Sequence, residues 1–232
     1  MSDRIFAVTG AFGVLGSAVA RAAAETGARV ALIDRTMEAP RGLTEACGDR
    51  AFTMGGVDLT EPGMARATIN AVHERFGRLD ALVNVAGGFA WQTLEEGDAE
   101  TWDRLHALNV KTCANASRAA IPFLKASPAG RIVNVGAAGA VKAAAGMGAY
   151  AASKAGVHRL TESLAEELKD SGVTVNAVLP SIIDTPANRA DMPKADFGKW
   201  VSPESLATVI LFLASEAAGD VTGALLPVTG RV

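Results

Sequence analysis

The side chains best suited to chemistry in this sequence are a tyrosine and a lysine four residues apart, Tyr150 and Lys154. On a helix this spacing places the phenol and the ammonium one turn apart on one face. The pKa of a free phenol is about 10, and a positive charge within a few ångströms lowers it by about 1–3 units. We therefore expect Lys154 to lower the pKa of Tyr150, so that the phenol can exchange a proton with a substrate. A pair at this spacing also arises by chance in many helices, so its context has to support it.

A glycine-rich turn follows the first predicted strand and leads directly into a helix. Backbone N–H groups at a helix N-terminus bind phosphate, and glycines allow the close approach that a dinucleotide needs. The turn could instead serve only to reverse the chain. The residues that we expect to contact the dinucleotide here are Gly10, Phe12, Gly13, Val14, Leu15 and Gly16.

Three further strand ends carry residues suited to the rest of a dinucleotide. Asp34 can accept hydrogen bonds from both hydroxyls of the adenosine ribose and repel a 2′-phosphate, which favours NAD(H). The adjacent Arg35 could receive that phosphate instead, so NADP(H) stays open. The other expected contacts are Asp58 with Leu59, for the adenine, and Asn84, Ala86 and Gly87, where small residues leave space. These residues could alternatively belong to ordinary turns.

Short β-branched runs alternate with longer amphipathic segments along the whole chain. Strands are predicted at 5–9, 29–34, 51–57, 79–85, 131–135, 173–179 and 224–228, and helices at 15–26, 62–76, 99–126, 150–169 and 203–215. This alternation predicts one Rossmann-type, doubly wound α/β domain over residues 1–232, with a seven-stranded, mainly parallel sheet flanked by helices. The irregular segment 181–202 is expected to be a substrate lid, or else a static surface loop.

Composition and charge exclude several classes of function. With 22 Lys and Arg against 25 Asp and Glu, and no long basic run, the chain is not expected to bind nucleic acid or a membrane. Cys47 and Cys113 lack the spacing of a disulfide or zinc site, and no metal is expected. His73, His106 and His158 lie in predicted helices without metal-spaced partners and are expected to have capping or surface roles. No leader or long apolar run is visible, so we expect a cytoplasmic protein acting on a small molecule.

Together, the order and spacing of these motifs resemble the short-chain dehydrogenase/reductase family over the whole chain. The resemblance implies an NAD(P)-dependent oxidoreductase in which Tyr150 exchanges the proton while Lys154 tunes it and holds the cofactor ribose. It further implies that Asn109 helps to hold a proton-relay water, and that Pro180, Ile183 and Thr185 lie at the nicotinamide. It also implies a homodimer or homotetramer, with long alanine-rich helices pairing across a two-fold axis.

The chain departs from the general family pattern at the substrate. Ala137 stands thirteen residues before the tyrosine, where most members carry a serine that bonds the substrate oxygen. In this respect, and in the glycine turn, the 86–90 segment and the proposed lid, the chain is most similar to dihydropteridine reductase. The similarity implies a quinonoid dihydropteridine as substrate, because Ala137 removes a donor and leaves room for a flat heterocycle. The expected substrate contacts are Phe89, Ala137, Tyr150 and Trp200.

Two other functions stay open at this stage. One is a carbonyl reductase or alcohol dehydrogenase of the 3-oxoacyl or polyol type, which would work without the usual serine. The other is a dinucleotide-binding regulator, in which the missing serine signals lost catalysis. The intact pair of Tyr150 and Lys154 argues against the regulator.

Overall fold

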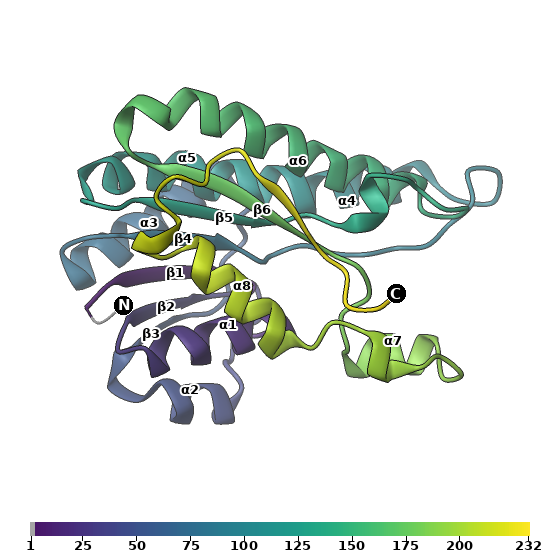
Figure 1. The fold of residues 1–232 in the computed structure, drawn as a ribbon, viewed down its shortest axis with the longest axis horizontal. Coiled ribbons are helices and arrows are strands. Elements are labelled where there is room, and N and C mark those ends of the chain that lie inside the picture. Colours follow the sequence, from purple (N-terminus) through teal and green to yellow (C-terminus); the bar gives the residue numbers. More distant parts are fainter. Residues whose placement is uncertain (1–2) are drawn as a thin grey trace.

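The computed structural model describes residues 3–232, and a seven-stranded sheet forms the centre of the molecule (Figure 1). The strands are β1 (Ile5–Thr9), β2 (Arg29–Ile33), β3 (Ala51–Met54), β4 (Ala81–Asn84), β5 (Arg131–Val135), β6 (Thr174–Pro180) and β7 (Leu225–Val228). Their order is β3-β2-β1-β4-β5-β6-β7, and all six pairings are parallel. The predicted doubly wound fold is therefore confirmed.

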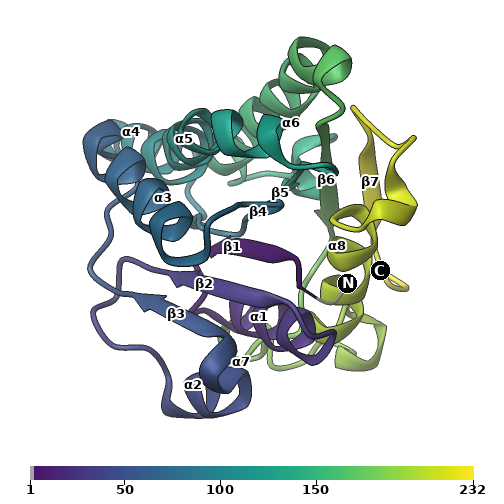
Figure 2. The ribbon, with the colours of Figure 1, turned by 90° about the vertical axis from the view of Figure 1, so that its left-hand side faces the viewer.

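Helices cover both faces of the sheet (Figure 2). One face carries α1 (Val14–Glu25), α2 (Arg41–Cys47) and α8 (Pro203–Leu213), and the other carries α3 (Pro62–Phe76), α4 (Ala99–His106), α5 (Thr112–Ala126) and α6 (Gly148–Leu168). Because both faces are covered, β1, β4, β5 and β6 are buried along their whole length, which explains their continuous apolar runs.

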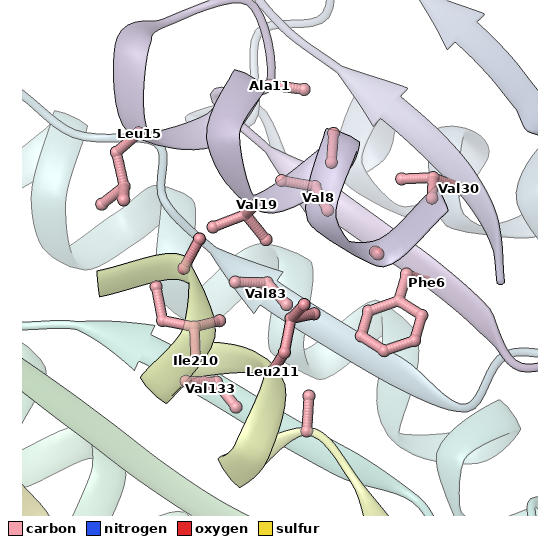
Figure 3. Close-up of a cluster of buried hydrophobic side chains, with 14 of the residues drawn as sticks. Phe6, Val8, Ala11, Leu15, Val19, Val30, Val83, Val133, Ile210 and Leu211 are labelled. Carbon is pink, nitrogen blue, oxygen red and sulfur yellow. The ribbon is translucent and has the colours of Figure 1, made fainter. Parts of the chain in front are cut away.

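Alternate residues of each strand belong to opposite cores. Phe6 and Val8 of β1 pack with Val19 of α1 and Ile210 of α8, as Figure 3 shows. Ile5 and Ala7 contribute to the second core, beneath α3, α5 and α6. The period of two along the strand thus anchors helices on both sides of the sheet.

The structure changes two of the predicted elements and adds a helix that was not predicted. The predicted helix 99–126 is divided by a π-helical turn, Ala107–Lys111, which inserts an extra residue and turns Asn109 into the interior. Strand β3 ends at Met54 instead of residue 57, because Gly56 turns the chain with φ +73. The seven-residue helix α2 was not predicted from the sequence.

The predicted lid 181–202 contains regular structure. It includes α7 (Pro186–Asp191), a 3-10 turn (Phe197–Lys199) and a parallel bridge between Ile183 and Val201. Figure 1 shows α7 beyond the carboxyl ends of the strands. Short 3-10 turns also occur at Gly48–Arg50, Ala138–Ala140, Lys169–Ser171 and Glu216–Ala218.

The strand order reverses between β1 and β4, whose connections run to opposite sides of the sheet. Ligands of open α/β sheets bind at this switch point, beyond the carboxyl ends of the strands. No helix within residues 3–232 is long and apolar enough to cross a membrane.

Candidate active site

A cavity of about 520 Å³ opens at the switch point. The loops after β1, β2, β3 and β4 and the start of α1 line most of it, and the π-helical turn, the start of α5 and Thr185 after β6 supply the rest. Of the residues predicted to bind a dinucleotide, it brings together Gly10, Phe12, Gly13, Val14, Leu15, Gly16, Asp34, Arg35, Asp58, Leu59, Ala86, Gly87 and Thr185. Sequence reasoning missed Thr36, Val57, Val85, Leu108 and Thr112; the first three adjoin predicted contacts, whereas the last two enter through the π-helical turn and α5.

The glycine turn packs backbone against backbone. Gly10 has φ +65, and a Cβ placed there would lie 2.8 Å from the backbone nitrogen of Ala86. A Cβ on Gly16 would collide with the carbonyl oxygen of Gly10. Helix α1 begins at Val14 with Gly13 as its N-cap, so no side chain caps its N-terminus. Residues 13–16 line the cavity, and uncapped N–H groups at a helix N-terminus can bind an anion.

The carboxylate of Asp34 is held at the cavity by two backbone hydrogen bonds. Its Oδ2 accepts from the N–H of Phe12 and its Oδ1 from that of Thr36, both at 2.9 Å. The guanidinium of Arg35 is 71% exposed and lies 3.8 Å from Asp58 Oδ2. Asp58 also accepts from Thr60, and these hydrogen bonds lower the pKa of its carboxyl. The end of the cavity predicted to bind the adenosine thus presents two carboxylates and one cation.

Asn84, predicted as a cofactor contact, does not line the cavity. The residue is buried, and its Nδ2 donates to Ser117 Oγ at 3.1 Å and to Asn134 Oδ1 at 2.9 Å. Because the last residue of β4 points between α5 and β5, its amide belongs to a polar network behind the site. Only the following residues, from Val85 onward, reach the cavity.

Asn109 joins the loop after β4 to helix α6. Its Oδ1 accepts from the N–H of Gly88 at 2.9 Å, and its Nδ2 donates to Gly88 O and to Ser153 Oγ. A Cβ at Gly87 would lie 2.5 Å from Asn109 Oδ1 and 3.4 Å from Lys154 Nζ, so the asparagine and the lysine meet beside this glycine. The role of Asn109 with a relay water stays a prediction.

The electrostatics of Tyr150 and Lys154 differ from the prediction. Burial raises the pKa of Tyr150 to about 12, so the expected lowering by Lys154 is wrong for this protein. Lys154 is 6% exposed, and burial lowers its pKa to about 8. Its Nζ donates to the carbonyl oxygen of Val135 at 2.7 Å. Desolvation is the cause of the raised pKa of the phenol and the largest cause of the lowered pKa of the lysine, and near pH 7 the pair is a protonated phenol and an ammonium.

The predicted substrate residues occupy different environments. The ring of Phe89 meets Tyr150 edge-on with 4.9 Å between centroids, and it is 54% exposed. Ala137 is buried just after β5. Trp200 is only 8% exposed and packs on Phe197 with 4.8 Å between centroids, so it supports the 181–202 segment, and its role as a substrate contact stays a prediction.

The lid segment is stabilised by its own contacts. Arg189 pairs with Asp184 through two hydrogen bonds and lies over the ring of Phe197. Pro180 ends β6 in the interior, and Ile183 forms the bridge to Val201. Neither Pro180 nor Ile183 lines the cavity, and within 181–202 only Thr185 does.

The histidines and cysteines lie apart from one another in different environments. Within residues 3–232, no three His, Cys, Asp or Glu side chains gather closely enough to hold an ion. His73 stacks on Phe123 and His106 is exposed, whereas His158 is buried and accepts a hydrogen bond, so its predicted surface role is wrong. Both cysteines are free and buried.

The sequence matches the family described as short chain dehydrogenase over residues 4–196. It is 32% identical to 2-(S)-hydroxypropyl-CoM dehydrogenase 3 of Xanthobacter autotrophicus, over 99% of this chain and 96% of that protein. It is also 32% identical to 3-oxoacyl-(acyl-carrier-protein) reductase FabG of Vibrio cholerae, over 99% and 97%. Its fold is similar to that of carveol dehydrogenase from Mycobacterium avium in complex with NAD, with a TM-score of 0.89, 24% identity and coverage of 99% and 97%. The chain therefore belongs to the short chain dehydrogenase family of oxidoreductases.

Proposed function

We propose that this protein is an NADH-dependent reductase of a quinonoid dihydropteridine. The observation that carries the proposal is the pairing of an exposed aromatic ring, Phe89, with the proton donor Tyr150. A flat heterocycle can stack on such a ring while its imine-like nitrogen faces the phenol. Ala137 supports the same substrate, because it presents no hydroxyl to hold a small carbonyl oxygen.

The cavity suits a nicotinamide dinucleotide. The N-terminus of α1 would bind the pyrophosphate and Asp34 the adenosine ribose, which favours NADH over NADPH. Arg35 is the residue through which NADPH would compete. The carveol dehydrogenase of similar fold contains NAD, in agreement with this assignment. When bound, the dinucleotide supplies the hydride.

The protonation states fit reduction. A phenol whose pKa lies near 12 is protonated at neutral pH, so Tyr150 can give its proton to the ring nitrogen of the substrate that gains negative charge when the quinonoid system is reduced. Lys154, with a pKa of about 8, is cationic at that pH and stabilises the phenolate that forms. The segment 181–202, carrying Thr185, would cover the bound ligands as a lid.

The direct test is NADH oxidation by purified protein with a quinonoid dihydropterin, followed by the loss of NADH absorbance. We expect saturable turnover, and slower turnover with NADPH. Absence of turnover at saturating substrate would reject the pteridine.

A carbonyl reductase of the 3-oxoacyl or polyol type is the second candidate function. The similarity to the Vibrio cholerae 3-oxoacyl reductase favours it. A panel of 3-oxoacyl thioesters, ketones and polyols, each with both cofactors, distinguishes it from the pteridine reductase. Tight NADH binding without turnover on any substrate would instead indicate a regulator.

We also propose that the protein is a homodimer or homotetramer. The helices α4, α5 and α6 lie together on one face of the sheet (Figure 2), and an alanine-rich helical face of this kind can pair across a two-fold axis. Light scattering at several protein concentrations tests the assembly.

A further inference from the structure

Helix α6 carries three titratable side chains at intervals of four residues. Tyr150, Lys154 and His158 follow one another along the helix and therefore lie on one face. The first two belong to the site described above. His158 is 3% exposed, and the proposed mechanism does not use it.

The buried imidazole of His158 contacts the segment that leaves β5. Its Nε2 accepts a hydrogen bond from the N–H of Ala137 at 3.3 Å. One turn earlier, Lys154 Nζ donates to the carbonyl oxygen of Val135. Between them, the N–H of Gly136 donates to Val178 O on β6 at 2.9 Å. Three successive residues are thus held, two by helix α6 and one by β6.

The imidazole also explains the glycine at position 136. A Cβ there would lie 2.5 Å from His158 Nε2 and 2.7 Å from its Cδ2. Leu179 bounds the same space from β6, at 3.3 Å from the added Cβ. The ring therefore occupies the volume that a side chain at Gly136 would need. This close packing holds the ring next to the backbone N–H of Ala137.

The hydrogen bond determines the state of the ring. Because Nε2 is the acceptor, the proton of the neutral imidazole lies on Nδ1. Burial lowers the pKa of His158, and the nearby Arg159 and Lys154 act in the same direction, so the neutral form persists near pH 7. A hydrocarbon of similar size would fill the space but leave the N–H of Ala137 without this acceptor.

We propose that His158 is a positioning residue for the reaction: its imidazole holds the backbone of Ala137 against helix α6, and so fixes the substrate wall relative to Tyr150. The proposal rests on the function proposed above, which places the substrate beside Ala137. Misplacement of a binding wall by a fraction of an ångström weakens the fit of substrate and transition state. The cavity proposed for the dinucleotide is lined by loops after the other strands and by none of Val135, Gly136, Ala137 and His158, so we expect dinucleotide binding not to depend on this contact.

The test compares H158L, which removes the acceptor, with H158Q, whose amide oxygen can replace it, and with H106L as a matched change at an exposed histidine of α4. For H158L we expect the amide of Ala137 to exchange its hydrogen at least about tenfold faster, and the KM for the quinonoid dihydropterin to rise about tenfold. The Kd for NADH should change less than about threefold, since its contacts are elsewhere. H158Q should restore most of both properties, and H106L should alter neither.

Unchanged amide exchange or an unchanged KM in H158L would overturn the proposal. A loss of NADH affinity as large as the rise in KM would also overturn it, because it would indicate a general disruption of the site. If the wild-type protein does not turn over the pterin, the function proposed above fails, while exchange at Ala137 and the KM of the substrate that is turned over still decide the role of His158. Should H158L not fold, the nitrogen resonances of His158 in the wild-type protein report its tautomer. A proton on Nδ1 supports the contact, and one on Nε2 refutes it.

Discussion

Replacing Lys154 by methionine should abolish turnover without destabilising the protein at pH 7. The pKa of this ammonium falls from 10.5 to about 8 on burial, and 10.5 − 8 is about 2.5 units, or about 3 kcal/mol at about 1.36 kcal/mol per unit. Removing the buried charge recovers that energy. The lost hydrogen bond to Val135 O costs about 1.5–3 kcal/mol, so K154M should be between equally stable and about 2 kcal/mol more stable.

The difference in stability between the wild-type protein and K154M should depend on pH. Between pH 8 and 10.5 the folded wild-type protein has released the proton of Lys154, whereas the unfolded chain still binds it. Wild-type stability therefore rises with pH in this window, by up to about 1.4 kcal/mol per unit, relative to K154M. Urea unfolding of both proteins at pH 7 and pH 10, at one protein concentration, measures the change.

A matched control is K142M, which alters an exposed lysine. Its free energy of unfolding should be nearly that of the wild-type protein at both pH 7 and pH 10. If the stability difference between wild type and K154M were the same at pH 7 and pH 10, Lys154 would not be a buried cation of lowered pKa. The electrostatic description of the site would then be wrong.

Three further outcomes are expected. Y150F should lose at least about a hundredfold in turnover with NADH affinity unchanged, as measured by steady-state kinetics and fluorescence titration; an active variant would exclude the phenol as the acid. G16A should weaken NADH binding at least about tenfold because its Cβ collides with Gly10 O, whereas G63A, whose Cβ meets nothing within 4 Å, should bind normally. D34S should raise the NADPH-to-NADH ratio of kcat/KM by at least about tenfold, and an unchanged ratio would argue that Asp34 does not face the ribose.

The strands and the glycine turn could be predicted because their signals are local. Strands β1 and β5 begin and end where the buried β-branched runs do, and the turn beginning at Gly10 leads from β1 into α1. The alternation of strand and helix periods then leaves few topologies other than a parallel doubly wound sheet. The short helices α2 and α7 could not be predicted, because they span only seven and six residues and have too few turns for a periodic hydrophobic pattern.

The π-helical turn could not be predicted from the sequence. Residues 99–126 have a continuous helical pattern, and nothing local marks the break. The side chain of Asn109 within it bonds to Gly88 and Ser153, which lie 21 and 44 residues away in the chain. The burial of Trp200, Asn84 and His158 could not be predicted for the same reason, because packing among distant elements decides whether a polar or aromatic group meets solvent or protein.

The sequence by itself determined which residues share a helix face or a strand end: Tyr150 with Lys154, and the glycine turn with the N-terminus of α1. Those relations depend on helical and extended geometry over a few residues. Only the tertiary structure decided the sign of the pKa shift at Tyr150 and the burial of Lys154. The energy of a charge depends on its solvation, and the groups that exclude water from this pair come from β5 and other elements far away in the chain.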